Sequence, residues 1–107
     1  MFFVVLATEA PGAAEKRSEI GPIHRAHLLN PCNHRVKVHL GGPTLTTQGS
    51  ATNGLLLVVE ADDIGAVSEF IADDPCSQAG VFKSVEIRPW AWTLGAPQPM
   101  TETESMN

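Results

Sequence analysis

The stretch Leu55-Leu56-Leu57-Val58-Val59 decides the fold, because a run of apolar residues without polar alternation predicts a strand buried on both faces. Residues 2–7, Phe-Phe-Val-Val-Leu-Ala, repeat this pattern and end in a loop that contains Pro11 and Gly12. We therefore expect these two stretches to be the central strands of one sheet.

Two further stretches alternate apolar and polar residues, which is the period of a strand with one buried face. They cover residues 36–40 and 81–88 and predict the edge strands. The first ends at Gly41-Gly42-Pro43, which predicts a turn. Residues 44–53, rich in Thr, Ser, Gln and Gly, then predict an exposed loop whose length would allow it to act as a lid.

Two stretches have helical spacing of apolar residues. The first runs from 13 to 29 and contains Gly21-Pro22, which predicts a kink or a second helix that starts at Pro22. The second begins at Ile64 and ends at Pro75.

The predicted order is βαββαβ, which at this length indicates an α+β, ferredoxin-like sandwich with both helices on one face of an antiparallel four-stranded sheet. Two short helices cover only one face, so the other apolar face needs a partner. We expect a homodimer, or a higher homo-oligomer, that packs sheet on sheet. The domain should span residues 1–95, followed by a polar tail over 96–107.

Composition limits the class of function. The chain has 107 residues, 7 Lys and Arg against 12 Asp and Glu, and a formal charge of -5, so we expect neither nucleic-acid nor membrane binding. Cys32 and Cys76 cannot build a disulfide framework, and the apolar run over 1–7 is short and lacks a preceding basic residue. These features favour a soluble cytoplasmic protein.

His24 and Asp74 are the first candidates for chemistry. His24 lies on the first helix, beside Gly21-Pro22, and histidine exchanges protons near neutral pH. Asp74 lies at the predicted C-terminal end of the second helix, where the helix dipole disfavours a carboxylate and a partner is needed. Because both helices share one sheet face, the two side chains can meet as a catalytic dyad or as an ordinary satisfied pair.

Four other candidates each have a functional and a structural interpretation. A metal site could use His24, His27, Cys32 and His34, but the metal-binding motifs with established spacing are absent and we predict no metal. Cys76 is a nucleophile or a small buried apolar residue. His39 lines a dimer cleft or is solvated, and Trp90 with Trp92 holds an aromatic ligand or packs at an interface.

From Phe2 to Trp90 the chain resembles the YciI-like (YCII-domain) proteins. The resemblance rests on the order and spacing of short landmarks, which are Phe2–Ala7, Glu15-Lys16-Arg17, Pro22-Ile23-His24, Leu28, Gly42-Pro43, Asp74-Pro75, Ala79–Phe82 and Val85–Trp90. The family is similar in fold to the dimeric α/β barrels, which agrees with the expected dimer.

The resemblance implies a His/Asp centre, and the matching positions are His24 and Asp74. Many relatives carry an Arg immediately before the Pro that precedes this His, whereas this chain has Gly21. If that Arg binds substrate in relatives, this chain either binds something different or uses another cation, and Arg17 and Arg88 are the candidates for that cation. His27, one turn from His24, is a further one, and our predicted substrate-binding residues are Arg17, His27, His39, Arg88 and Trp90.

One branch of the family resembles dehydrochlorinases that remove HCl from chlorinated hydroxyhydroquinones. This suggests the hypothesis that His24 takes a phenolic proton, Asp74 orients the imidazole, and chloride leaves while Arg88 or His27 supports the developing anion. The reaction needs no metal or organic cofactor. Two alternatives stay open: a dimeric module that binds a ligand or partner without turnover, and a cofactor-free monooxygenase, which would consume oxygen.

Overall fold

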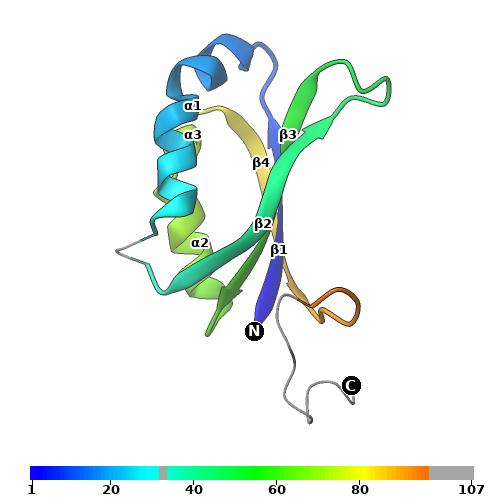
Figure 1. Ribbon diagram of the computed structural model, residues 1–107. Helices are drawn as coiled ribbons and strands as arrows, with labels where there is room; N and C mark the ends of the chain where they lie inside the picture. The colour runs from blue at the N-terminus through cyan, green and yellow to red at the C-terminus, as the bar shows by residue number, and fades with distance from the viewer. Residues whose placement is uncertain (32–33, 97–107) are drawn as a thin grey trace.

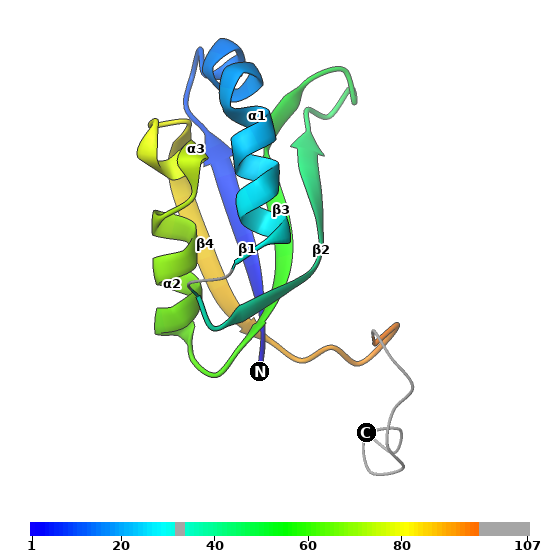
Figure 2. The same cartoon turned by 60° about the vertical axis from the view of Figure 1, so that its left-hand side comes forward.

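The computed structural model describes residues 1–31 and 34–96 (Figures 1 and 2). The elements follow the predicted order, with one additional short helix, and are β1 (Phe2–Glu9), α1 (Ala14–Leu29), β2 (Val36–Leu45), β3 (Thr52–Ala61), α2 (Ile64–Ala72), α3 (Pro75–Gln78) and β4 (Phe82–Trp90). Residues 97–107, which make up nearly all of the predicted tail, and Cys32 lie outside the described residues, and the domain boundary at residue 95 stays a prediction.

The four strands form one antiparallel sheet in the order β2-β3-β1-β4. The three helices lie on one face, and the other face is uncovered within the described residues (Figure 1). The predicted ferredoxin-like α+β fold is confirmed. The two strands without polar alternation are the central ones, because a central strand in this layer has no edge and little contact with water.

The core lies between the sheet and α2. Phe3, Val5, Leu57 and Val59 point to the helix-covered face and are fully buried, as are Val67 and Phe70 of α2. Helix α1, in contrast, has no buried residue. This difference leaves space between α1 and the sheet, and that space matters for the site described below.

The predicted turn at Gly41-Gly42-Pro43 is wrong, because β2 continues through it to Leu45. A Cβ at Gly41 would collide with the side chain of Leu57 on the neighbouring strand, so this glycine permits close strand packing rather than a turn. Pro43 is tolerated because β2 is an edge strand. The predicted exposed loop over 44–53 therefore shrinks to residues 46–51.

Helix α1 is continuous across Pro22, so the alternative of a second helix that starts there is wrong. The helix bends between its blue N-terminal turns and its cyan C-terminal turns (Figure 1), as expected when proline removes a backbone donor.

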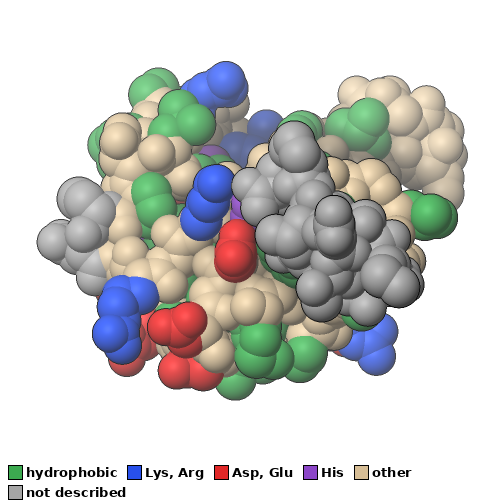
Figure 3. Space-filling view, turned by 60° about the horizontal axis from the view of Figure 1, so that its bottom comes forward, with side chains coloured by type: hydrophobic (Ala, Val, Ile, Leu, Met, Phe, Trp, Pro, Cys, Tyr) green, Lys and Arg blue, Asp and Glu red, His purple; other side chains and the backbone are tan. Residues whose placement is uncertain are grey.

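Among the described residues, no helix is long and apolar enough to cross a bilayer. Lys and Arg side chains alternate with Asp and Glu on the end of the molecule seen in Figure 3.

Candidate active site

Asp74 is positioned by the connection between α2 and α3. Helix α2 ends at Ala72, and Asp74 is the N-cap of α3, where its Oδ1 accepts a hydrogen bond from the backbone N–H of Cys76 at 2.8 Å. Asp74 follows the C-cap of α2, as predicted, but it also begins α3, whose N-terminus favours a carboxylate. Pro75, which ends one helix in the sequence pattern, is also well suited to the first position of the next.

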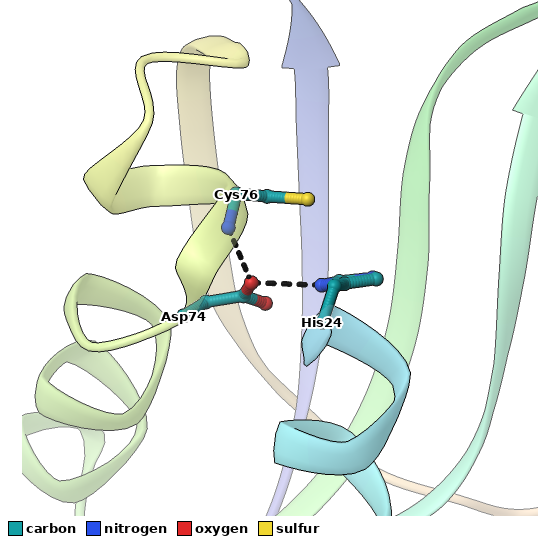
Figure 4. A group of neighbouring side chains, drawn as sticks. All are labelled: His24, Asp74 and Cys76. Atoms are coloured by element: carbon teal, nitrogen blue, oxygen red, sulfur yellow. Dashed lines mark hydrogen bonds and ion pairs between the residues drawn. The ribbon is translucent and has the colours of Figure 1, made fainter. Parts of the chain in front are cut away.

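His24 and Asp74 form a hydrogen-bonded pair, with 2.7 Å between His24 Nδ1 and Asp74 Oδ1 (Figure 4). The Asp74 side chain is fully buried and that of His24 is 17% exposed. Since Nδ1–H donates its hydrogen bond to the carboxylate, the neutral imidazole has its lone pair at Nε2. The ring extends away from Asp74 (Figure 4), which leaves Nε2 to accept a proton from a ligand.

Cys76 lies beside this pair but is poorly suited to act as a nucleophile. Burial raises the pKa of its thiol to about 11, and the negative charges of Asp74 and Glu9 add to this effect, while Arg17 opposes it. The thiol is therefore protonated at neutral pH. It packs with Ala13 and Val81 in a small apolar cluster, which favours the structural interpretation of Cys76.

Three potential metal ligands meet at this point. The ligand atoms of His24, Asp74 and Cys76 all lie within 4.8 Å of one another. Two of them, His24 Nδ1 and Asp74 Oδ1, are hydrogen-bonded to each other, and the thiol would have to lose its proton to bind a metal ion. This set differs from His24, His27, Cys32 and His34, the set that the sequence suggested and that we did not predict to bind metal.

A groove of about 660 Å³ lies between α1 and the edge strand β2 and includes His24 in its wall. Apolar side chains from both elements and from β3 form much of it, among them Leu28, Val38 and Leu57. Two cations, Arg25 and Lys37, also line it. Sequence reasoning missed both, although Arg25 lies one helical turn from Gly21 and shares a helix face with it.

The two predicted cations lie elsewhere. Arg17 is not part of the groove and pairs with the largely buried carboxylate of Glu9, with 2.6 Å between Arg17 Nε and Glu9 Oε2. Arg88 is exposed and lies 3.3 Å from Glu86, on the uncovered face of the sheet. The structure therefore does not bring either arginine to the His24–Asp74 pair.

His27 turns toward α2 rather than toward the groove. Its Nε2 donates to the backbone carbonyl of Phe70 at 2.9 Å, and its ring stacks on the Phe70 ring with 4.5 Å between centroids. His34 pairs instead with Asp73 at 3.0 Å. His24 and His27, three residues apart on the helix, thus have different partners, and Cys32, the fourth residue of the metal set considered from the sequence, lies outside the described residues.

His39 and Trp90 belong to an aromatic cluster at one end of the uncovered sheet face. His39 borders the groove, but its Nε2 donates to Glu60 at 2.7 Å and its ring packs edge-on against Phe2. Trp90 packs against Trp92, with 5.3 Å between ring centroids. The contact with Trp92 favours a packing role for Trp90. His39 has Glu60 as its hydrogen-bond partner.

The fold and the site together define a class of small ferredoxin-like α+β proteins with a His–Asp pair at a groove between a helix and the sheet. Within this class the chain belongs to the YCII-related domain family, whose model matches residues 1–91. The predicted family is therefore confirmed. An uncharacterized protein of Haemophilus influenzae is 23% identical over 94 residues, which cover 84% of this chain and 96% of that protein.

Two solved structures are similar to this chain. One is 5-chloro-2-hydroxyhydroquinone dehydrochlorinase (TftG) from Burkholderia phenoliruptrix in complex with 2,5-dihydroxybenzoquinone, with a TM-score of 0.71, 28% identity, and coverage of 85% of this chain and 94% of that chain. The other is an uncharacterized NIPSNAP domain protein from Burkholderia xenovorans, with a TM-score of 0.50, 12% identity, and coverage of 91% and 98%. At this identity the second likeness concerns the fold alone.

Proposed function

We propose that the protein is a cofactor-independent lyase that eliminates HCl from a chlorinated hydroxyhydroquinone, with His24 as the proton-transferring residue and Asp74 as its orienting partner. The observation that carries this proposal is the 2.7 Å hydrogen bond between a fully buried carboxylate and an imidazole at the wall of a largely apolar groove. The likeness to a dehydrochlorinase supports the choice of reaction.

The elimination balances without an external oxidant. His24 Nε2 accepts a proton from a ring hydroxyl, and the imidazolium returns a proton to the ring carbon that bears chlorine. Loss of the proton from a second hydroxyl then pushes electrons to that carbon, the C–Cl bond breaks, and chloride leaves. The carbon skeleton ends as a hydroxyquinone, because replacement of C–Cl by C–H compensates for the oxidation of the two hydroxyls.

Asp74 suits the role of orienting partner for two reasons. Its Oδ1 is held by the N–H of Cys76, so the carboxylate has a defined position. A buried negative charge at 2.7 Å also stabilises the imidazolium that forms during proton transfer. The alternative, a binding module without turnover, gains less support, since such a module does not need a hydrogen-bonded His–Asp pair beside the ligand groove.

We also propose that a second copy of this chain covers the open face of the sheet, as in a dimeric α/β barrel. Leu6 and Leu40 are 38% and 48% exposed, although both lie on strands of the sheet. Light scattering should give about twice the chain mass of 11.4 kDa, and Leu6→Glu should give monomers with an unchanged circular dichroism spectrum. A monomeric unmodified protein would contradict this.

A chloride-release assay with 5-chloro-2-hydroxyhydroquinone tests the reaction, with dissolved oxygen followed in parallel. Elimination predicts chloride release without oxygen consumption. Stoichiometric oxygen consumption would favour the monooxygenase alternative, and binding of the substrate without chloride release would favour the module without turnover.

A further inference from the structure

The charge of the groove between α1 and β2 differs from that of the chain. Its described lining contains Arg25 and His24 and no Asp or Glu, while Lys37 and His39 border it from β2 with side chains on the other face of the sheet. The chain as a whole has 12 acidic residues against 7 Lys and Arg. The described lining thus carries the charge of Arg25 with no carboxylate in it, and such a site favours an anionic ligand.

Arg25 is placed to bind that ligand. It follows His24 directly and lies one helical turn after Gly21, and all three line the groove. Arg25 is exposed, and no ion pair or side-chain hydrogen bond joins it to another residue within 1–31 and 34–96. A guanidinium without a protein partner keeps its donors free for a carboxylate or another oxyanion.

Lys37 borders the groove from β2, but its side chain points to the opposite face of the sheet, because Val36 and Val38 on either side of it pack against the core. Glu60 lies opposite Lys37 in the β2–β3 register, but the Glu60 carboxylate is hydrogen-bonded to His39 Nε2 at 2.7 Å. No ion pair to Lys37 occurs in the part of the chain that the structure describes. Within the described lining, Arg25 is therefore the cation whose side chain lies on the helix-covered side of the sheet.

We propose that this groove binds an aromatic anion, and that Arg25 binds its anionic oxygen while the apolar walls hold the ring. The inference rests on the proposed function and names its substrate class. Product chemistry agrees with it, because a hydroxyl group on a quinone ring is a vinylogous acid and is ionised at neutral pH. Arg25 then performs the anion-binding role that Gly21 cannot provide.

The test is equilibrium binding, which needs no turnover. Calorimetry compares 2,5-dihydroxybenzoquinone, which is anionic at neutral pH, with 2,5-dimethoxybenzoquinone, which has the same ring and no charge. A second pair, 2,5-dihydroxybenzoate and its methyl ester, replaces the ring oxyanion by a carboxylate. We expect each anion to bind about tenfold tighter than its neutral partner, and this preference to decrease as salt increases. The ligand pair with the larger ratio of anion affinity to neutral affinity shows whether the groove prefers a ring oxyanion or a carboxylate.

Variants locate the binding cation. Arg25→Gln should remove most of the preference for the anion, and Arg25→Lys should keep part of it. Two controls should cause no loss: Lys37→Gln, whose side chain lies on the other face of the sheet, and Lys83→Gln, at an exposed position of β4 outside the groove. Because a Cβ at Gly21 would have no atom within 4 Å, Gly21→Arg has room and should restore anion binding in the Arg25→Gln background.

Equal affinity for anion and neutral ligand would overturn the proposal, as would a preference that survives in the Arg25→Gln variant. Loss of the preference in Arg88→Gln would also overturn it, because Arg88 lies on the other face of the sheet. Failure of the elimination reaction is a separate result: His24→Gln should abolish chloride release and still bind the anion more tightly than the neutral ligand.

Discussion

His24 Nδ1 and Asp74 Oδ1 lie 2.7 Å apart although 50 residues separate them in the chain. The same Asp74 oxygen accepts the backbone N–H of Cys76 at 2.8 Å and so caps α3. One carboxylate thus fixes a helix start and orients an imidazole. Stability and activity are therefore coupled at this residue, and substitutions that separate the two roles are informative.

Asp74→Asn should keep the cap, because the amide oxygen still accepts the Cys76 N–H, and should lose the negative charge that stabilises an imidazolium. We expect kcat for chloride release to fall about 10²-fold with little change in urea unfolding. Asp74→Ala should in addition lose about 1 kcal/mol or more of stability.

Asp63 provides the matched control, since it caps α2 through Ala66 N–H at 2.9 Å and has no histidine partner. Asp63→Ala should cost about 1 kcal/mol of stability and leave kcat unchanged. If Asp74→Asn retains full kcat, the orienting role of Asp74 is wrong.

Cys76→Ala should retain chloride release. The Cys76 thiol is buried and protonated at neutral pH, and the hydrogen bond to Asp74 comes from the backbone N–H, which alanine also has. Initial rates of the variant and the unmodified protein make the comparison. Complete loss of chloride release in a folded Cys76→Ala protein would contradict this and would support Cys76 as the nucleophile.

The stability of the protein should decrease between about pH 9 and pH 11. The pKa of Cys76 rises from 9.0 to about 11 in the folded protein, mainly because the thiol is buried. In this range the unfolded chain has lost the thiol proton and the folded chain retains it, so the free energy of unfolding falls as pH rises. Urea unfolding at several pH values measures the slope. Cys76→Ala should show a smaller slope, and an identical slope in both proteins would contradict the assignment.

Gly54→Ala should destabilise the sheet. A Cβ at Gly54 would collide with the backbone carbonyl of Ala7 on β1 and approach Thr44 Oγ1 on β2, and neither central strand can shift freely. We expect a loss of about 1–3 kcal/mol in urea unfolding. Gly42→Ala is the control, because a Cβ there meets nothing within 4 Å. Equal stability of the two variants would show that the strands adapt.

Residues 2–7 and 55–59 were sufficient to predict the central strands, because continuous apolar runs have few alternatives in a small α+β domain. The stretch Gly41-Gly42-Pro43 led to the wrong prediction of a turn, because glycine occurs both in turns and where two strands lie close together. Here the neighbouring strand, with the side chain of Leu57, shows that the second case applies. Spacing within one strand does not contain this information.

The candidate site, like the fold, was predictable from the sequence only in part. His24 and Asp74 were predictable as a pair because the topology places both helices on one face. The cap at Asp74 was not, because α3 is a four-residue helix with too few positions for a periodic pattern. Arg25 was missed because a helical cation normally indicates a solvated face, and the groove exists only because α1 stands away from β2.

The most direct test of the central claim is anaerobic chloride release from 5-chloro-2-hydroxyhydroquinone by the unmodified protein, His24→Gln and His34→Gln. His34 is a second His–Asp contact, 3.0 Å from Asp73 and outside the groove, so it controls for loss of an ordinary histidine pair. We predict that His24→Gln lowers kcat about 10²–10⁴-fold and that His34→Gln retains it. Undiminished chloride release by a folded His24→Gln protein would contradict the account.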